Sequence, residues 1–351
     1  MKRFILLSVC SVCLSTIQAQ KKIYIPEDLR GMDLQADTSQ WSFKRSAQTD
    51  DLIFMWERGF GQDVSNPPML DGKPMSFNLN NLIDCVQSFY TFFRDTLAFS
   101  EPGSKADQYK MMVMVMYSLD GTAYGGTYDN FIGSLWVAPN RIQDTKMNCM
   151  AHELGHSFQL QIPADSVGDA WGGSGFFEMT SQWMLWQVNP DWLTDENFHF
   201  EAFKKLTHKA YLHLENIYHS PYVIQWWSDL HGRKSIAELY RQGKIGEDPV
   251  LTYMRLYGLS QEEFREAVRK ERWNEFILEG HRWFDLKRWH ILVKYVKGHS
   301  PASESLKIQN VSKRNYYLPL PQDQLILNPN LEQNWGYSGE TGDGPYGAEF
   351  E

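Results

Sequence analysis

The spacing of apolar residues predicts strands and helices in the first half of the chain and mainly helices in the second. Residues 79–98 repeat apolar side chains at helical spacing, which favours an amphipathic helix. Residues 110–118 and 132–137 are short apolar runs, and the glycine-rich segment between them is typical of turns. We expect these two strands to form a β-ribbon. The expected fold class is therefore α+β.

Two further helices are predicted on either side of a polar loop. The first begins after Pro139, contains KMNCMAHELGHSFQLQ and ends before Pro163. The second, GFFEMTSQWMLWQV, begins at Gly175 and stops near Pro190. From about residue 197 onward the pattern is almost wholly helical. The expected breaks in that region are Pro221, Gly232, Gly243, Gly258 and Gly280.

The N-terminus predicts export. Lys2 and Arg3 precede an apolar run that is too short to span a bilayer, and a small-residue site follows at Ala19. We therefore expect residues 1–19 to be a signal peptide, and the mature chain to lie in the periplasm or at the outer membrane and cell surface, without a transmembrane span. A lipid anchor at Cys10 or Cys13 is a weaker alternative, because both follow Val and not a small residue.

Composition narrows the classes of function. A formal net charge of -9, with no long block of like charges, argues against a nucleic-acid partner. The 351 residues, 42% of them hydrophobic, suffice for one large domain or two smaller ones. Beyond the signal peptide only Cys85 and Cys149 remain, each within an apolar helical pattern. We expect buried free thiols, with a disulfide as the alternative, and no thiol catalysis.

The pentapeptide HELGH carries the strongest chemical signal. His152 and His156 are four residues apart, so on a helix their imidazoles lie on one face and can reach one ion. Zinc lowers the pKa of a bound water to about 7, and a neighbouring carboxylate can then take its proton. Glu153 is the expected general base, and Gly155 is expected to leave space beside the ion. The spacing predicts a zinc site of the metallopeptidase kind.

A third protein ligand is expected downstream. Glu178 follows His156 by 22 residues on an apolar helix, where an unpaired carboxylate would be costly. This arrangement is typical of gluzincins, in which a second helix supplies a carboxylate. Gln159 and Ile162 occupy positions where a metzincin would have Gly and His, which excludes that class. Asp165 and Asp169, in the loop between the helices, are the alternative ligands.

Supporting residues are less sharply defined by the sequence. Gln182, one turn after Glu178, is a candidate to hold an imidazole N–H of His152, with a core or solvated amide as the alternative. A group that stabilises a developing oxyanion is also needed. The candidates for it, which could equally serve in packing, are Tyr218, His219 and Tyr222.

The stretch from HELGHSF to GFFEMTSQWMLW resembles gluzincin-like domains of exported proteins from gut-type Gram-negative bacteria. The segments YIPEDLRGMDLQADTSQWSF, SKADQYKMMVM, WVAPNRIQD and YHSPYV resemble one uncharacterised family of that kind. The resemblance covers roughly residues 23–265 and implies a zincin-like catalytic domain, assigned to residues 20–265, with a small β-sheet and hydrolase chemistry. His152, Glu153 and His156 match the motif directly, and Glu178 matches the third-ligand position.

The end of the chain resembles a different family. VRKERWNEFILEGHRWFDLKRW, YLPLPQDQL and NPNLEQNWGY are similar to the C-terminal end of SusD/RagB glycan-uptake lipoproteins. We assign residues 266–337 to this segment, as an amphipathic helix over 268–289 followed by an extended stretch, and expect residues 338–351 to be disordered. The helical-repeat body of that family is missing, so the chain looks like a fusion. The apolar side chains expected to be buried here are Phe276, Ile277, Trp283 and Phe284.

Together these patterns predict an exported zinc-dependent metallohydrolase, a peptidase that acts on proteins or glycoproteins, with Zn²⁺ as its cofactor. Two alternatives remain at this point. One is a SusD/RagB-type outer-membrane component that binds glycans and works with nutrient-uptake machinery. The other is an inactive fusion product in which the zinc site is only a scaffold.

Overall fold

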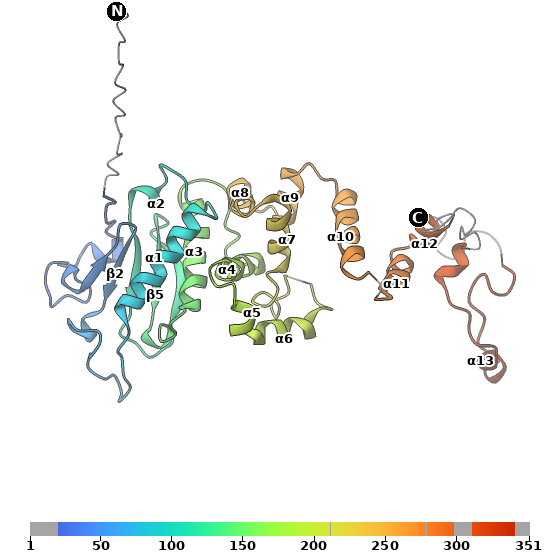
Figure 1. Ribbon diagram of the computed structural model, residues 1–351, viewed down its shortest axis with the longest axis horizontal. Coiled ribbons are helices and arrows are strands. Elements are labelled where there is room, and N and C mark those ends of the chain that lie inside the picture. Colours follow the sequence, from blue (N-terminus) through green and yellow to red (C-terminus); the bar gives the residue numbers. More distant parts are fainter. Residues whose placement is uncertain (1–19, 211, 278, 298–310, 341–351) are drawn as a thin grey trace, which may run out of the picture. The chain divides into compact units, whose positions relative to one another are not determined.

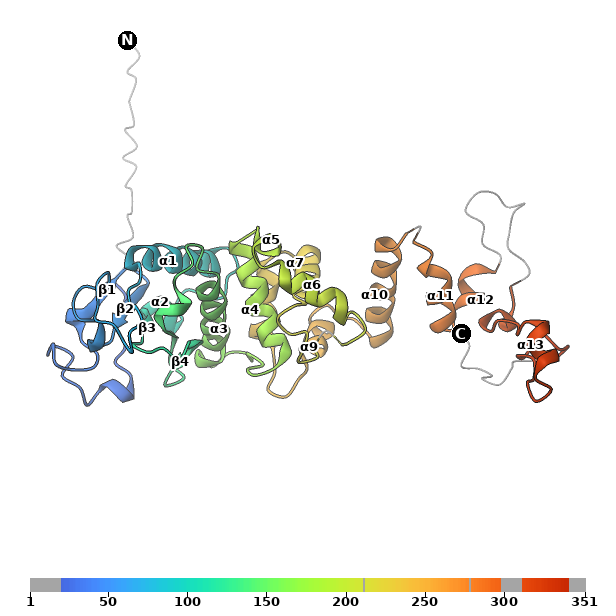
Figure 2. The same ribbon diagram turned by 90° about the horizontal axis from the view of Figure 1, so that it is seen from below.

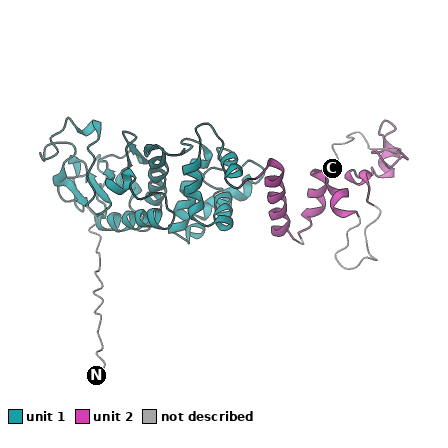
Figure 3. Cartoon of the chain, turned by 90° about the horizontal axis from the view of Figure 1, so that it is seen from above, with its two compact units in different colours: residues 1–257 teal, residues 258–351 magenta. Residues whose placement is uncertain are grey.

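The computed structural model describes residues 20–210, 212–277, 279–297 and 311–340. It divides the chain into two compact units between Tyr257 and Gly258 (Figure 3). The predicted signal peptide, and residues 341–351 of the predicted disordered tail, lie outside the described residues. The predicted boundary between residues 265 and 266 falls inside helix α10 (Gln261–Glu275), shortly after this division. The functional assignment of the two parts stays a prediction.

A five-stranded mixed sheet forms one side of the first unit, in the order β1-β2-β3-β5-β4 (Figure 1). The three inner strands are parallel, and each outer strand is antiparallel to its neighbour. Strands β2 and β3 are buried throughout, which matches their uninterrupted apolar sequences LIFMW and MMVMV. The strands are β1 (Ser46–Gln48), β2 (Leu52–Trp56), β3 (Met111–Val115), β4 (Ala123–Tyr128) and β5 (Ile132–Val137).

The β-ribbon prediction was wrong. The two predicted strands exist as β3 and β5, but they are parallel neighbours in register from Met112 opposite Ser134, and not a hairpin. The glycine-rich segment between them, which was expected to form turns, contains β4, the edge strand. A Cβ on Gly125 of β4 would lie 1.8 Å from the carbonyl oxygen of Glu153. Glycine in this strand therefore reflects the close approach of a helix backbone. Strands β1 and β2 were not predicted.

Helix α1 (Leu79–Asp95) confirms the predicted amphipathic helix, three residues shorter at its C-terminal end. Its first turn is capped by Asn78, whose side-chain oxygen accepts a hydrogen bond from the Asn81 N–H at 3.0 Å. Helix α3 (Asn148–Ala164) packs beside α1 and against β4 and β5 (Figure 1). The next helix, α4 (Gly175–Val188), packs on α3, so that α3 lies between the sheet and α4 (Figure 2).

The bounds of α3 differ from those predicted at both ends. Only a 3-10 turn, Pro139–Arg141, directly follows β5, and α3 begins at Asn148. At the other end Pro163 lies inside the helix, in its last turn. A proline this near the end removes one backbone donor without disturbing the rest. The Asp165 N–H, which bonds to the Gln161 carbonyl at 2.9 Å, closes the helix.

The rest of the first unit is helical, as predicted. Gly232 and Gly243 end two of the helices, and Pro249 begins a third at its first turn. Among the described residues, no helix has both the length and the apolar character needed to cross a membrane. Cys85 and Cys149 are free thiols, but they are half-buried rather than fully buried. The helices are α2 (Lys105–Gln108), α5 (Trp192–Asp195), α6 (Asn197–Leu206), α7 (Tyr222–His231), α8 (Lys234–Gln242) and α9 (Pro249–Leu256).

The second unit differs from its prediction. The single helix expected over 268–289 is split into α10 and α11 (His281–Arg288), because Gly280 adopts a φ of 78° between them. The side chains expected to be buried are largely exposed, from 37% for Phe276 to 66% for Phe284. The later stretch is not wholly extended, since it contains α13 (Gln322–Leu327). The unit's small core lies around α12 (Leu292–Val296) and consists of Leu286, Ile291, Leu292, Val311 and Tyr316.

Candidate metal centre

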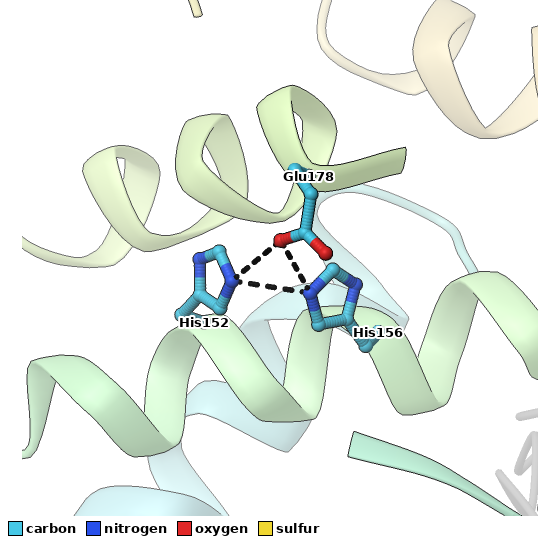
Figure 4. A group of neighbouring side chains, drawn as sticks. All are labelled: His152, His156 and Glu178. Carbon is cyan, nitrogen blue, oxygen red and sulfur yellow. Dashed lines mark hydrogen bonds and ion pairs between the residues drawn. The ribbon is translucent and has the colours of Figure 1, made fainter. Parts of the chain in front are cut away.

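Three side chains from two helices converge on one point (Figure 4). His152 and His156 extend from α3, and Glu178 extends toward them from α4. The two imidazole Nε2 atoms are 3.1 Å apart. Oε2 of Glu178 lies 3.3 Å from Nε2 of His152 and 3.1 Å from Nε2 of His156. The structure thus brings together the three residues that were expected to be ligands.

The two helices can approach because Gly155 faces α4. A Cβ on Gly155 would lie 2.5 Å from Oγ of Ser181 and 3.3 Å from its Cα. The Ser181 hydroxyl also donates a hydrogen bond to the His152 carbonyl oxygen. Gly155 was expected to leave space around the ion, but the structure places it at the helix–helix contact. The glycine therefore sets the distance between the helix that carries the histidines and the helix that carries Glu178.

Two glutamines orient the imidazoles. Nδ1 of His156 lies 2.9 Å from Oε1 of Gln159, and Nδ1 of His152 lies 2.7 Å from Oε1 of Gln182. The orientation of Gln159 is fixed, because its Nε2 donates to the Phe177 carbonyl at 2.9 Å. Its oxygen can only accept, so Nδ1 of His156 carries the proton and Nε2 presents a lone pair. Gln182 contacts His152 as predicted, but its own Nε2 faces a ring nitrogen of His199 and not a backbone carbonyl.

These residues fit a tetrahedral metal ion. Zinc–nitrogen and zinc–oxygen bonds of about 2.0–2.1 Å in a tetrahedral site place the ligand atoms about 3.3 Å from each other. The three donor–donor distances, 3.1, 3.1 and 3.3 Å, are close to this spacing. Lone pairs on two neutral imidazoles and a carboxylate would repel each other at such distances without a cation or a proton between them. The donor set of two imidazoles and one carboxylate also suits zinc.

The two glutamates differ in their surroundings. Burial alone would raise the pKa of Glu178, but hydrogen bonds and charge interactions with His152 and His156, when their imidazoles are protonated and donate to it, outweigh burial and hold that pKa well below its usual range. Burial raises the pKa of Glu153, although its Oε2 accepts a hydrogen bond from the Gly125 N–H at 2.7 Å. The pKa values of the two carboxylates beside the histidines are thus shifted in opposite directions.

A pocket of about 460 Å³ opens over the three side chains. It lies between β4, α3 and α4, and residues 196–199 and Tyr218 complete its wall. The ring of Tyr218 lies 5.9 Å from that of His152. Burial, together with its interaction with Glu178, raises the pKa of Tyr218 to about 12, so its hydroxyl stays protonated. Arg141 is the cationic residue of this lining among the described residues.

The alternative candidates lie in other environments. Asp165 accepts hydrogen bonds from the Lys105 N–H and from Gln161, and Asp169 accepts one from the Trp171 N–H, so neither belongs to the converging group. His219 contacts His199, with Nδ1 atoms 2.6 Å apart. The Tyr222 hydroxyl is buried without a hydrogen-bond partner among the described residues. Of the three oxyanion candidates, only Tyr218 lines the pocket.

Several supporting residues were missed by sequence reasoning. Gln159 was noted only because it excludes a metzincin, yet it holds His156 and is itself held by the Tyr240 hydroxyl at 2.8 Å. Behind Gln182 lies His199, with an Nε2–Nε2 separation of 3.2 Å. Gln159 could have been found from its position, because it is an amide on an apolar helix one turn after His156. No local pattern pointed to Tyr240, because 81 residues separate it from Gln159.

A segment of 82 residues, 23% of this chain, is 39% identical to "SusD-like protein P25" of Formosa agariphila. The chain spans only 15% of that relative's length. No solved structure matches the chain. A family model described as "Family of unknown function (DUF6055)" matches residues 15–337, which include both units. The chain therefore belongs to the family DUF6055.

Proposed function

We propose that the first unit is a zincin-like, zinc-dependent hydrolase that cleaves peptide bonds. The observation that carries this proposal is the convergence of His152, His156 and Glu178 at the donor spacing of a tetrahedral ion, beside the carboxylate of Glu153. The comparisons lend no support to hydrolase chemistry, so the proposal rests on the geometry of the pocket. Bound zinc would supply Lewis-acid chemistry there and make a water molecule acidic enough to lose a proton near neutral pH.

The side chains around the histidines have distinct roles in this mechanism. Glu153 takes the proton of the attacking water, and the Gly125 N–H fixes one of its oxygens by a hydrogen bond of 2.7 Å. Glu153 then passes the proton to the leaving amine. Tyr218, protonated at neutral pH, donates a hydrogen bond to the oxyanion that develops on the substrate carbonyl. Gln159 and Gln182 keep both Nε2 atoms directed at the same point.

A peptide substrate is favoured by the position of β4. This strand is an edge of the sheet, and Ala123, Tyr124 and Gly125 line the pocket. An extended peptide can add to a sheet edge through main-chain hydrogen bonds, whatever its sequence. Such pairing would place a peptide carbonyl close to the converging side chains. The exposed ring of Tyr124 would then contact the substrate's side chains.

Metal analysis and turnover test the proposal together. We expect the purified chain to hold one zinc ion, to lose it in His152→Ala and Glu178→Ala, and to hydrolyse an unstructured protein such as casein. Glu153→Gln should keep the zinc and lose at least about a hundredfold in turnover. Asp169→Asn, a loop carboxylate outside the converging group, is the matched control and should change neither. Substoichiometric zinc, or unchanged turnover in Glu153→Gln, would contradict the proposal.

The second candidate function, which the comparisons favour, is a SusD-type role. The match to a SusD-like protein, 39% identity over 82 residues, supports a role at the cell surface in glycan uptake. On this proposal the chain binds glycan or a component of the uptake machinery through residues 258–351. Binding to surface glycans should be lost on truncation after Tyr257, provided circular dichroism shows that the remainder is folded. Full-length Glu153→Gln should retain it. Binding that survives the truncation would exclude this role.

A further inference from the structure

The second unit contains a pocket whose residues neither proposal above names, and an inference about it deepens the proposed glycan-binding role and rests on it. Its volume is about 590 Å³, within the range of small-ligand sites. It is lined by α10, α11 and the region of α12, with Trp273, Ile277, Ile291 and Tyr295 as its apolar walls. All these residues belong to the second unit and lie in sequence well after the metal centre. The pocket can therefore be considered on its own.

The charge of this pocket opposes that of the whole protein. Its lining includes three cations, Arg269, Lys270 and Arg282, and one carboxylate, Glu266. The chain as a whole carries a formal net charge of -9. A local excess of positive charge in an acidic chain raises the local concentration of anions. The ligand that best matches this lining is therefore an anion.

Arg282 is the half-buried cation of this lining that has no ion-pair partner among the described residues. Its guanidinium stacks on the ring of Trp273, 3.9 Å from the centroid, and lies 5.5 Å from that of Tyr295. Among the described residues it has no hydrogen bond and no ion pair, although burial lowers its pKa. A guanidinium has five N–H donors, and those of Arg282 are open to solvent, where the oxygens of a ligand can take the place of water.

The neighbouring carboxylates Glu266 and Asp285 do not supply the missing partner, because each is already paired. Glu266 accepts hydrogen bonds from Arg269 at 2.5 Å and from the Tyr295 hydroxyl at 2.8 Å. Asp285 pairs with Arg272 at 2.7 Å and with Arg288 at 2.8 Å. The carboxylates near Arg282 are therefore engaged elsewhere, and its fork of donors remains available to a ligand.

From these contacts we infer that the pocket binds a small oxyanion, a carboxylate or a sulfate, carried on a ring. The planar guanidinium of Arg282 accepts two oxygens of such a group side by side. Trp273, 48% exposed, offers ring surface against which the apolar face of a sugar or aromatic ring can pack. Lys270 and Asn274, at the pocket wall, can reach hydroxyl groups on the ring.

The test titrates the full-length chain with three ring-bearing anions and two controls in a calorimeter. The anions are glucuronate, glucose 6-sulfate and benzoate, which separate a uronic acid, a sulfated sugar and an aromatic acid. Glucose is the uncharged ring and inorganic sulfate the anion without a ring. We expect saturable binding of at least one ring-bearing anion, no binding of glucose, and at least tenfold weaker binding of sulfate. Affinity should fall as salt rises.

Substitutions then locate the site. Arg282→Gln should weaken binding at least tenfold, and Arg282→Lys, which keeps the charge but not the fork, should restore only part of it. Arg265→Gln is the matched control. Arg265 lies on α10 in the same unit, is exposed and pairs with Glu262 outside the pocket. The Arg265→Gln variant should bind the ring-bearing anion with the same affinity as the unaltered chain. EDTA should not change binding, which separates this site from the proposed hydrolase.

Thermal unfolding distinguishes a binding role from a packing role. If Arg282 serves a ligand, Arg282→Gln removes a half-buried charge that has no ion-pair partner, and the melting temperature should stay the same or rise. A fall in melting temperature together with unchanged affinity would assign Arg282 to packing against Trp273 and overturn the inference. Failure of all three ring-bearing anions to bind at millimolar concentration would overturn it as well.

Discussion

The side-chain oxygen of Gln159 lies 2.9 Å from Nδ1 of His156, and this contact determines which nitrogen of the histidine faces Glu178. Gln159→Leu would remove the acceptor and allow the imidazole to change tautomer. We expect zinc affinity to fall about 10–100-fold, measured by competition with a chromophoric chelator. Gln182→Leu should have a similar effect through His152. Gln187→Leu, on α4 but hydrogen-bonded to Gln225, is the control and should leave zinc affinity unchanged.

Tyr218 and Tyr222 offer a matched pair for testing oxyanion stabilisation. Tyr218 lines the pocket, whereas the Tyr222 hydroxyl is buried without a partner among the described residues. Tyr218→Phe should keep zinc and lower kcat about 10²–10³-fold, with little change in KM, because its hydrogen bond forms to the developing charge. Tyr222→Phe should leave kcat unchanged and should not lower the melting temperature. Equal kcat in both variants would remove Tyr218 from the mechanism.

Gly125 lies where the edge strand β4 packs closely against helix α3. An added methyl group would lie 1.8 Å from the Glu153 carbonyl oxygen, so Gly125→Ala must push β4 away from α3. We expect a loss of about 1–3 kcal/mol in the free energy of unfolding and a disturbed hydrogen bond to Glu153. Denaturant titration and turnover would measure the two effects. Gly31→Ala is the control, since no atom lies within 4 Å of the place its Cβ would occupy, and both quantities should remain unchanged.

Asp51 ties the N-terminal segment to the sheet and makes stability pH-dependent. Burial alone would raise its pKa, but the ammonium of Lys21 at 2.7 Å, with Gln87 and Arg94, outweighs burial and lowers it. A carboxylate with a lowered folded-state pKa stabilises the fold above its unfolded pKa of about 3.9, and this stabilisation is lost as pH falls through the folded value.

Asp51→Asn should therefore reduce the loss of stability on acidification below about pH 4. At neutral pH it should lower the free energy of unfolding by about 3 kcal/mol, because Lys21 is left buried without its counter-ion. Urea titrations at a series of pH values would show both effects. Asp50→Asn, at the exposed neighbouring position, should leave the pH profile unchanged. If the free energy of unfolding of Asp51→Asn falls with acidification as steeply as that of the unaltered chain, this carboxylate does not control acid stability.

Several elements are predictable from local signals that agree with each other. Caps and glycines act within one turn of the chain. They account for the start of α1 after Asn78, the start of α4 after Ser174 and the breaks at Gly232 and Gly243. The candidate ligands followed from periodicity as well, because a spacing of four fixes two histidines on one helix face. A carboxylate on an apolar helix indicated Glu178, since burial demands a partner.

The way in which those elements pack together depends on contacts between distant parts of the chain. No sequence pattern specifies the register between β3 and β5, and none could show that Gly125 and Gly155 are glycines because a strand and a helix approach α3 there. Gln159 and Tyr240 hold His156 across a long sequence separation, beyond the reach of local patterns. The partnerless guanidinium of Arg282 likewise emerges only when every neighbouring charge among the described residues is placed. Close packing and pairing between distant segments are properties of the folded chain, and no short window of sequence contains them.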